Sequence, residues 1–346
     1  MAGRKHHHVP QFLQRKFGLQ GTKATKVVVF RKGQEPFCTN TINYGAERDF
    51  YSEGEDFCVD ELITDYESDI QAFLNLLVNS DENALLERAT IAALISHLEM
   101  RSAFLRSQLL ELSGVMVDFI EKTFTDRQLL IDMLITSIKD NPTILRDAIV
   151  ESLGDSAPID AIEQFVTPQL KGLIGPEISP FIEGFADTLI MMRTSLQGMV
   201  KPSHLKALGS HPDEIARKEF YADLTYTVHS ESVGSFILPD TMVSFVTTKR
   251  LTPVTQKGDE LVEVFLPLSS GSLLVGSRKR RTPRKVSEIN SILASTSYNS
   301  FIAIEDRPDF RKLSGKIGRN AKLISEADTK SVFREVLKEL TGNRRA

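Results

Sequence analysis

The sequence lacks tryptophan altogether and contains only two cysteines, Cys38 and Cys58, among its 346 residues. Two thiols are too few for a disulfide framework or a zinc cluster, so the sequence predicts a protein of the reducing cytoplasm. No run of about 18 consecutive apolar residues occurs, and no membrane span is expected. The apolar core of a secretory signal peptide is also missing from the N-terminus, so no signal peptide is expected.

Several motifs that identify common enzyme classes are absent as well. The chain has no glycine-rich phosphate loop, no Gly-x-Ser-x-Gly nucleophile elbow and no Cys-x-x-Cys pair. These absences disfavour dinucleotide binding and serine-triad hydrolysis. The net charge of -4 gives no bulk electrostatic attraction to nucleic acid or to an anionic membrane.

Three regions of the chain differ in their apolar pattern. Residues 1–59 are mixed and contain one strand-like apolar run. Residues 60–219 have the spacing of amphipathic helices, including one long helix that begins at an N-cap at Ser80 and ends at Gly114. From residue 220 the apolar period changes to two, which indicates a β-rich region with flanking helices over 220–346.

This order of elements predicts an α+β fold. The early strand has no partner nearby in the sequence, so we expect the N-terminal segment to join an antiparallel sheet formed by the C-terminal part. The helical region is then a multi-helix insertion that packs against the sheet. The three regions together are expected to form one composite domain.

Three of the seven histidines lie side by side near the start of the chain, as His6, His7 and His8. In an extended segment, His6 and His8 point to one side and His7 to the other. Two imidazoles at this spacing can share a divalent metal ion with a carboxylate such as Glu61. A histidine that acts as a general base fits the same residues, because histidine titrates near neutral pH. The alternative is one buried histidine that anchors the terminus, with the others solvated.

Charged residues farther along the chain extend this list of candidates. Glu61 and Glu67 belong to an acidic cluster at a helix start, where carboxylates also complement the helix dipole. Arg101 lies on the long predicted helix, where a guanidinium can bind a phosphate or carboxylate through two hydrogen bonds. An interior ion pair with Glu67 or Asp240 is the alternative role for Arg101.

The strongest charge run covers residues 278–285, in which six of eight residues are basic. A loop of this kind can bind the phosphate backbone of nucleic acid, although no aromatic residue interleaves it for base stacking. A solvated loop between a strand and a helix is the alternative. The basic residues are Arg278, Lys279, Arg280, Arg281, Arg284 and Lys285.

Several short sequence motifs, spread over nearly the whole chain, together form a pattern that can be compared with known families. They are His7-His8-Val9-Pro10, Asp49-Phe50-Tyr51, Glu61 with Glu67, Arg101, Phe236-Ile237-Leu238-Pro239-Asp240, Leu266-Pro267-Leu268-Ser269 and Ile289-Asn290. Together they resemble an uncharacterised bacterial family, domain of unknown function 4238, which opens with His-His-x-Val-Pro. Around Asp240 the sequence departs from the Ser-Asp-Asn-Pro that the family more often has. The resemblance implies a family and no activity.

The leading hypothesis is a metal-dependent phosphodiesterase or nuclease with a toxin-like or phage-defence role in bacteria. Its expected catalytic residues, lining one cleft, are His7, His8, Glu67, Arg101 and Asp240. Its expected metal ligands are His6, His8 and Glu61, and its expected partner is nucleic acid, bound through the 278–285 loop. The alternative is a non-catalytic module that binds a ligand or partner, in which the same polar cluster is structural.

Overall fold

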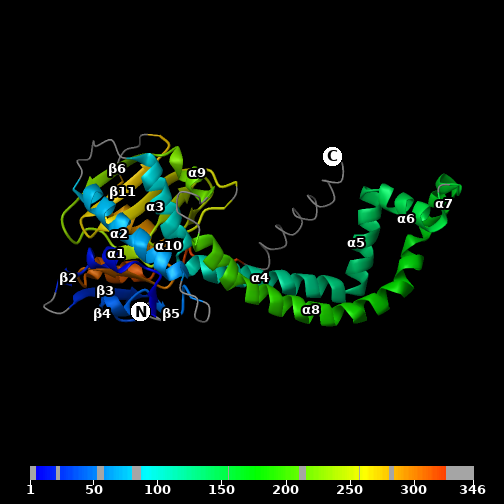
Figure 1. Cartoon of the computed structure of the whole chain (residues 1–346), viewed down its shortest axis with the longest axis horizontal. Coiled ribbons are helices and arrows are strands. Elements are labelled where there is room, and N and C mark those ends of the chain that lie inside the picture. The colour runs from blue at the N-terminus through cyan, green and yellow to red at the C-terminus, as the bar shows by residue number, and fades with distance from the viewer. Residues whose placement is uncertain are drawn as a thin grey trace. The chain divides into compact units, whose positions relative to one another are not determined.

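The structure is a computed structural model that describes residues 5–20, 24–52, 58–79, 87–154, 156–209, 216–256, 258–279 and 284–324. Antiparallel sheets and numerous helices confirm the predicted α+β class. The chain divides into two compact units (Figure 1). Unit 1 comprises Met1–Gln108 and Lys201–Leu323, and unit 2 comprises Leu109–Val200 and Ile324–Ala346. The single composite domain that the sequence predicted stays a prediction.

The described residues of unit 1 form two five-stranded antiparallel sheets and a two-stranded one, β1 (Lys5–His7) with β5 (Ala46–Arg48), in place of the single predicted sheet. One five-stranded sheet has the strand order β6-β11-β10-β8-β9, and the other has the order β2-β3-β12-β7, with β4 paired to β3. The strands of the first are β6 (Thr225–Ser230), β8 (Ser244–Thr247), β9 (Leu251–Thr252), β10 (Leu261–Ser269) and β11 (Ser272–Ser277). Those of the second are β2 (Leu19–Gln20), β3 (Thr25–Arg31), β4 (Phe37–Asn40), β7 (Leu238–Pro239) and β12 (Ser300–Ala303).

The expected pairing of the early strand with the C-terminal part is confirmed. Strand β3 runs antiparallel to β12, with Phe30 opposite Phe301 and Val28 opposite Ala303. The rings of Phe30 and Phe301 stack with centroids 4.9 Å apart. The apolar run of β3 is buried on both faces, which explains its lack of polar alternation.

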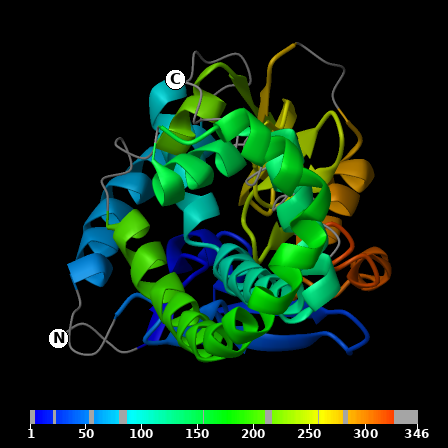
Figure 2. The same cartoon turned by 90° about the vertical axis from the view of Figure 1, so that its right-hand side faces the viewer.

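Helices cover the sheets and supply much of the core of unit 1. Helices α2 and α3 cross the β6–β11 sheet in Figure 1, and α10 and α11 lie side by side in Figure 2. Apolar residues of α2 and α3, such as Leu74 and Leu94, join one core cluster with Val228 and Leu274 of that sheet. The helices are α1 (Gln11–Arg15), α2 (Cys58–Val78), α3 (Arg88–Met100), α9 (Glu219–Ala222), α10 (Val286–Thr296) and α11 (Pro308–Ser314).

The long helix predicted from Ser80 to Gly114 is interrupted. Its described part divides into α3 and α4 (Ala103–Thr125), and the predicted N-cap Ser80 lies outside the described residues. Ser102 begins the second helix, because its hydroxyl accepts a hydrogen bond from the Leu105 N–H at 3.2 Å. This break places Arg101 at a helix end.

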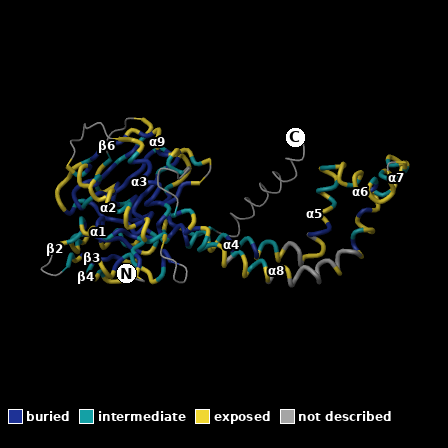
Figure 3. The backbone as a smooth tube through the Cα atoms, in the orientation of Figure 1, coloured by how far each residue is buried: buried dark blue, intermediate teal, exposed yellow. Residues whose placement is uncertain are grey.

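The described part of unit 2 consists of helices. The helices of unit 2 are the later part of α4, α5 (Arg127–Asp140), α6 (Thr143–Leu153), α7 (Ile159–Val166) and most of α8 (Leu170–Leu208). Among the side chains of these helices that the structure describes, buried ones are sparse, in contrast to the dense core of unit 1 (Figure 3). Of the helices that the structure describes, none is both long and apolar enough to cross a membrane.

Candidate functional site

Polar and aromatic side chains from five segments of unit 1 come together around the N-terminal histidines. The segments are β1 (Lys5–His7), the turn after β5 (Ala46–Arg48), α2, the α3–α4 junction and the end of α8. We call this group the histidine–arginine cluster. Its members are His6, His7, His8, Phe50, Tyr51, Asp60, Glu67, Arg101, Arg106 and His204.

Arg101 occupies the interior of the cluster. Its side chain is 1% exposed, and its Nη2 atom lies 2.6 Å from Oε1 of Glu67. The same nitrogen donates to the His7 carbonyl at 2.6 Å, and Nε donates to the Tyr51 hydroxyl at 2.9 Å. Burial opposes the charge of Arg101, but Tyr51 and Glu67 outweigh it and raise the pKa of Arg101. The structure therefore brings together three sequence candidates and gives Arg101 the predicted ion pair with Glu67.

His6 anchors the N-terminal strand. Its Nδ1 accepts a hydrogen bond from the Tyr51 N–H at 2.7 Å, and its ring stacks on that of Tyr51. Because Nδ1 is an acceptor, the neutral ring carries its proton on Nε2, which lies 3.8 Å from Oδ1 of Asp60. Neither ring nitrogen of His6 then offers a free lone pair to a metal ion.

The ring of His7 is also held in place. Its Nε2 donates to the Ile42 carbonyl at 3.1 Å, and the Gln11 amide contacts the same ring. Burial lowers the pKa of His7. His7 is therefore a neutral residue whose ring and carbonyl both tie β1 to its neighbours.

His8 differs from the other two histidines. Its buried Nδ1 has no hydrogen-bond partner in the described part of the chain, and its ring packs against Phe50 with centroids 5.4 Å apart. Burial and then the charge of Arg101 are the main causes that lower the pKa of His8 to about 3, and Arg106 acts in the same direction. The imidazole is therefore neutral near pH 7 and able to accept a proton.

Arg106 and His204 were not identified from the sequence. Arg106 donates to the Phe50 carbonyl at 2.6 Å and, through Nε, to Nδ1 of His204 at 3.2 Å. The only available signal was a second arginine on an apolar helical pattern, five residues after Arg101. His204 is far away in sequence, and no local pattern points to it.

Asp240 is not part of the cluster. Its buried carboxylate accepts hydrogen bonds from the backbone N–H groups of Tyr298, Asn299 and Ser300 at 2.7–2.9 Å. Burial raises the pKa of Asp240 to about 6, against the effect of these donors. In this arrangement Asp240 fixes the turn that leads into β12. This is a structural role, which differs from the predicted catalytic one.

The remaining sequence candidates lie on the surface or are paired elsewhere. Glu61 is exposed in the first turn of α2. Arg284 binds Glu263 of β10, with Nε 3.0 Å from Oε2, so its charge is already matched. The exposed members of the basic run are Arg278, Lys279 and Lys285, while Arg280 and Arg281 lie outside the described residues.

Metal ligation gains no support from the described geometry. Across the described ranges, no three His, Cys, Asp or Glu side chains are arranged to hold a metal ion. The divalent metal and its ligands His6, His8 and Glu61 stay a prediction.

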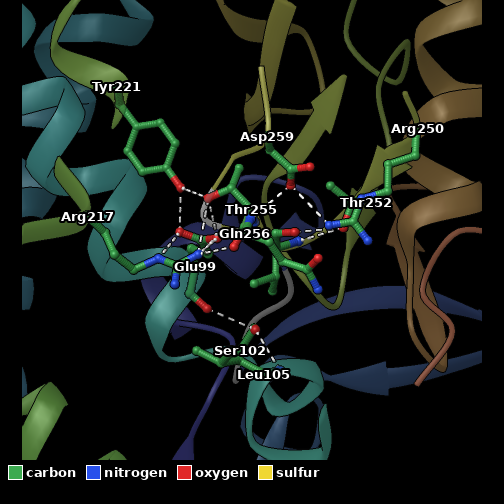
Figure 4. Close-up of polar contacts among 11 residues, drawn as sticks. Glu99, Ser102, Leu105, Arg217, Tyr221, Arg250, Thr252, Thr255, Gln256 and Asp259 are labelled. Atoms are coloured by element: carbon green, nitrogen blue, oxygen red, sulfur yellow. Dashed lines mark hydrogen bonds and ion pairs between the residues drawn. The ribbon is translucent and has the colours of Figure 1, made fainter. Parts of the chain in front are cut away.

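A second buried network surrounds Glu99, which the sequence analysis did not identify (Figure 4). The wholly buried Glu99 carboxylate accepts from the Thr255 N–H at 2.7 Å, from Arg217 at 2.7 and 2.9 Å, and from the Tyr221 hydroxyl. Both carboxylate oxygens are satisfied and the charge is paired. This network fastens α3 to α9 and to the segment before β10, which is a structural role.

Comparisons with known proteins add no identification: no family model, curated protein or solved structure matches the chain. The resemblance to domain of unknown function 4238 stays a prediction. Function is therefore argued from the geometry of the cluster.

Proposed function

We propose that the histidine–arginine cluster is the active site of a phosphodiester hydrolase. His8 is the observation that supports this most directly. Its Nδ1 has no hydrogen-bond partner among the described residues, its ring is neutral near pH 7, and it is close enough to Arg101 and Arg106 to be affected by both charges. A neutral imidazole in such a position can take a proton from an attacking water or hydroxyl.

The charges around His8 favour an anionic substrate. Arg101 and Arg106 both disfavour protonation of His8. A bound phosphate offsets these charges and raises the pKa of His8 toward the range in which a general base is effective. Substrate binding and base strength are thus coupled in this arrangement.

In the proposed reaction, a water molecule or substrate hydroxyl attacks phosphorus while His8 accepts its proton. The bond between phosphorus and the leaving oxygen breaks, and the leaving oxygen then takes the proton back from His8. Arg101 acts as a positioning residue, because its hydrogen bond to the His7 carbonyl fixes the backbone next to His8.

Unpartnered polar atoms are concentrated in the same region, which supports a functional site. Among the residues that the structure describes, they include Nδ1 of His8 and both ring nitrogens of His97, four residues before Arg101. Buried polar groups without partners are rare in folded proteins and require an explanation such as a ligand or ordered water.

We propose nucleic acid as the substrate class. The exposed cations Arg278, Lys279 and Lys285 are available to a phosphate backbone. A divalent metal cofactor, a cytoplasmic location and a toxin-like or phage-defence role in bacteria are further parts of the proposal.

A module that binds a phosphate ligand without turnover is the second candidate. The rings of His6 and His7 favour it, since both are engaged in hydrogen bonds that hold the fold. This candidate keeps the anion site and assigns His8 no proton transfer.

Hydrolysis assays on purified protein separate the two candidates. Bis(p-nitrophenyl) phosphate, RNA and DNA are tested with added Mn²⁺ or with EDTA. His8→Gln is expected to lose roughly 10²-fold or more in kcat, the usual contribution of a general base, at an unchanged melting temperature. His229→Gln, at a half-buried histidine of β6, is the matched control. Phosphate binding by wild type without hydrolysis of any diester would favour the second candidate.

A further inference from the structure

Arg101, the arginine that the sequence singled out for phosphate binding, is not available to a ligand. The Glu67 carboxylate matches its charge at 2.6 Å, and the His7 carbonyl and Tyr51 hydroxyl take further donors. Its remaining nitrogen, Nη1, is buried away from solvent. A substrate phosphate must therefore bind to a different cation.

Arg106 has the opposite properties. It is 8% exposed against 1% for Arg101, and its guanidinium lies 3.4 Å from the centroid of the Phe50 ring. Its hydrogen-bond acceptors are the Phe50 carbonyl and Nδ1 of His204, which are both uncharged. No carboxylate of the described residues forms an ion pair with it, and Glu47 acts on it only at longer range. A largely buried charge without a counter-ion is costly, and an anionic ligand removes that cost.

His204 is suited to hold Arg106 without cancelling its charge. Nε2 of His204 donates to the Met100 carbonyl at 2.7 Å, so Nδ1 keeps its lone pair and faces the guanidinium. Burial lowers the pKa of His204 to about 4, so the ring stays neutral near pH 7. A carboxylate at this position would orient Arg106 equally well but would neutralise it.

We infer that Arg106 binds the phosphate group of the substrate and that His204 positions it. The rings of His8 and Phe50 pack together and Arg106 lies on the ring of Phe50, so a phosphate on Arg106 lies near His8. Charge-assisted hydrogen bonds from a fixed guanidinium are well matched to phosphate oxygens. This inference rests on the proposed function, because it names the residue that holds the substrate of that site.

Two substitutions at residue 204 give a test in which shape is constant and only charge changes. In His204→Asn and His204→Asp, a side-chain oxygen takes the place of Nδ1 as the acceptor for Arg106. The first acceptor is neutral and the second is an anion that pairs with the guanidinium. Both variants lose the hydrogen bond to Met100, so any stability loss from that bond is common to them.

The measurement is the affinity of the full chain for inorganic phosphate, determined by isothermal titration calorimetry. Wild type and His204→Asn should bind phosphate, whereas His204→Asp should bind it roughly tenfold or more weakly, the worth of one charge-assisted hydrogen bond. Arg106→Gln should weaken binding by at least as much. Arg307→Gln, at a cation that directly precedes α11 and donates to the Gly234 carbonyl, should not. If His204 had a purely structural role, the two variants would change the affinity for phosphate by the same amount.

Failure of this inference is distinguishable from failure of the proposed function. Equal phosphate affinity in His204→Asp and His204→Asn, or no phosphate binding by wild type, overturns the inference. If His8-dependent hydrolysis is nevertheless observed, the proposed function stands without it. If phosphate binding depends on Arg106 but wild type hydrolyses no diester, the binding site stands and the hydrolase proposal fails.

Discussion

Glu67→Gln should destabilise unit 1 strongly, and adding Arg101→Met should recover part of the loss. The side chain of Arg101 is 1% exposed, whereas that of Glu67 is 27% exposed. Replacing the carboxylate by an amide leaves a charged guanidinium inside the protein without its counter-ion, held by neutral acceptors that include the His7 carbonyl and the Tyr51 hydroxyl. Removing both partners leaves no uncompensated charge.

The size of the effect follows from these partners. Loss of one member of a buried ion pair costs about 3–5 kcal/mol, and the lower end applies because the glutamine oxygen still accepts a hydrogen bond. The double variant loses two further hydrogen bonds of about 0.5–1.5 kcal/mol each, while methionine replaces the apolar stem of the arginine. We therefore expect a net cost of about 1–3 kcal/mol for the double variant.

Tyrosine fluorescence during urea unfolding isolates unit 1. The chain has no tryptophan, and all six tyrosines fall within unit 1. Glu231→Gln, at an exposed site in unit 1, is the control and should change the free energy of unfolding by less than about 0.5 kcal/mol. A cost below about 1 kcal/mol for Glu67→Gln, or a double variant less stable than this single variant, would refute the account of the ion pair.

Three further predictions concern stability, each measured by tyrosine-monitored unfolding. The pKa of Asp240 is raised to about 6 in the folded state, above about 3.9 in the unfolded chain, so the folded state binds the proton more tightly. Stability should therefore fall as pH rises from about 4 to 6, and Asp240→Asn should flatten this slope. Gly45→Ala should cost about 1–3 kcal/mol, because Gly45 has φ +59° and an added Cβ would lie 2.6 Å from Cβ of Val9. Glu99→Gln should cost about 2–3 kcal/mol through weakened charge-assisted bonds from Arg217; a neutral result would exclude a structural role for that network.

Much of the fold was predictable because apolar periodicity reports which faces are buried. The run in β3 is apolar on both faces, and the structure buries both within the main core cluster. The break between α3 and α4 was missed because Leu98 and Leu105, seven residues apart, keep the helical period across it. The only local sign of the break was Ser102, a residue type that favours N-caps.

The candidate site was only partly predictable. The sequence left Glu67 or Asp240 as the partner of an interior ion pair, the alternative role of Arg101, and the structure contains the pair with Glu67. The partners of Asp240 are backbone N–H groups, which every residue type supplies, so no sequence pattern distinguishes a turn-fixing aspartate from a catalytic one. Arg106 and His204 meet only through the tertiary fold, 98 residues apart.

The most direct test of the central claim is kcat/KM for hydrolysis of bis(p-nitrophenyl) phosphate by wild type and by His8→Gln, with the melting temperature of each. The account predicts measurable hydrolysis by wild type and a loss of roughly 10²-fold or more in the variant at an unchanged melting temperature. Equal hydrolysis by both proteins, or a fall that only follows a lowered melting temperature, would contradict an active site at His8.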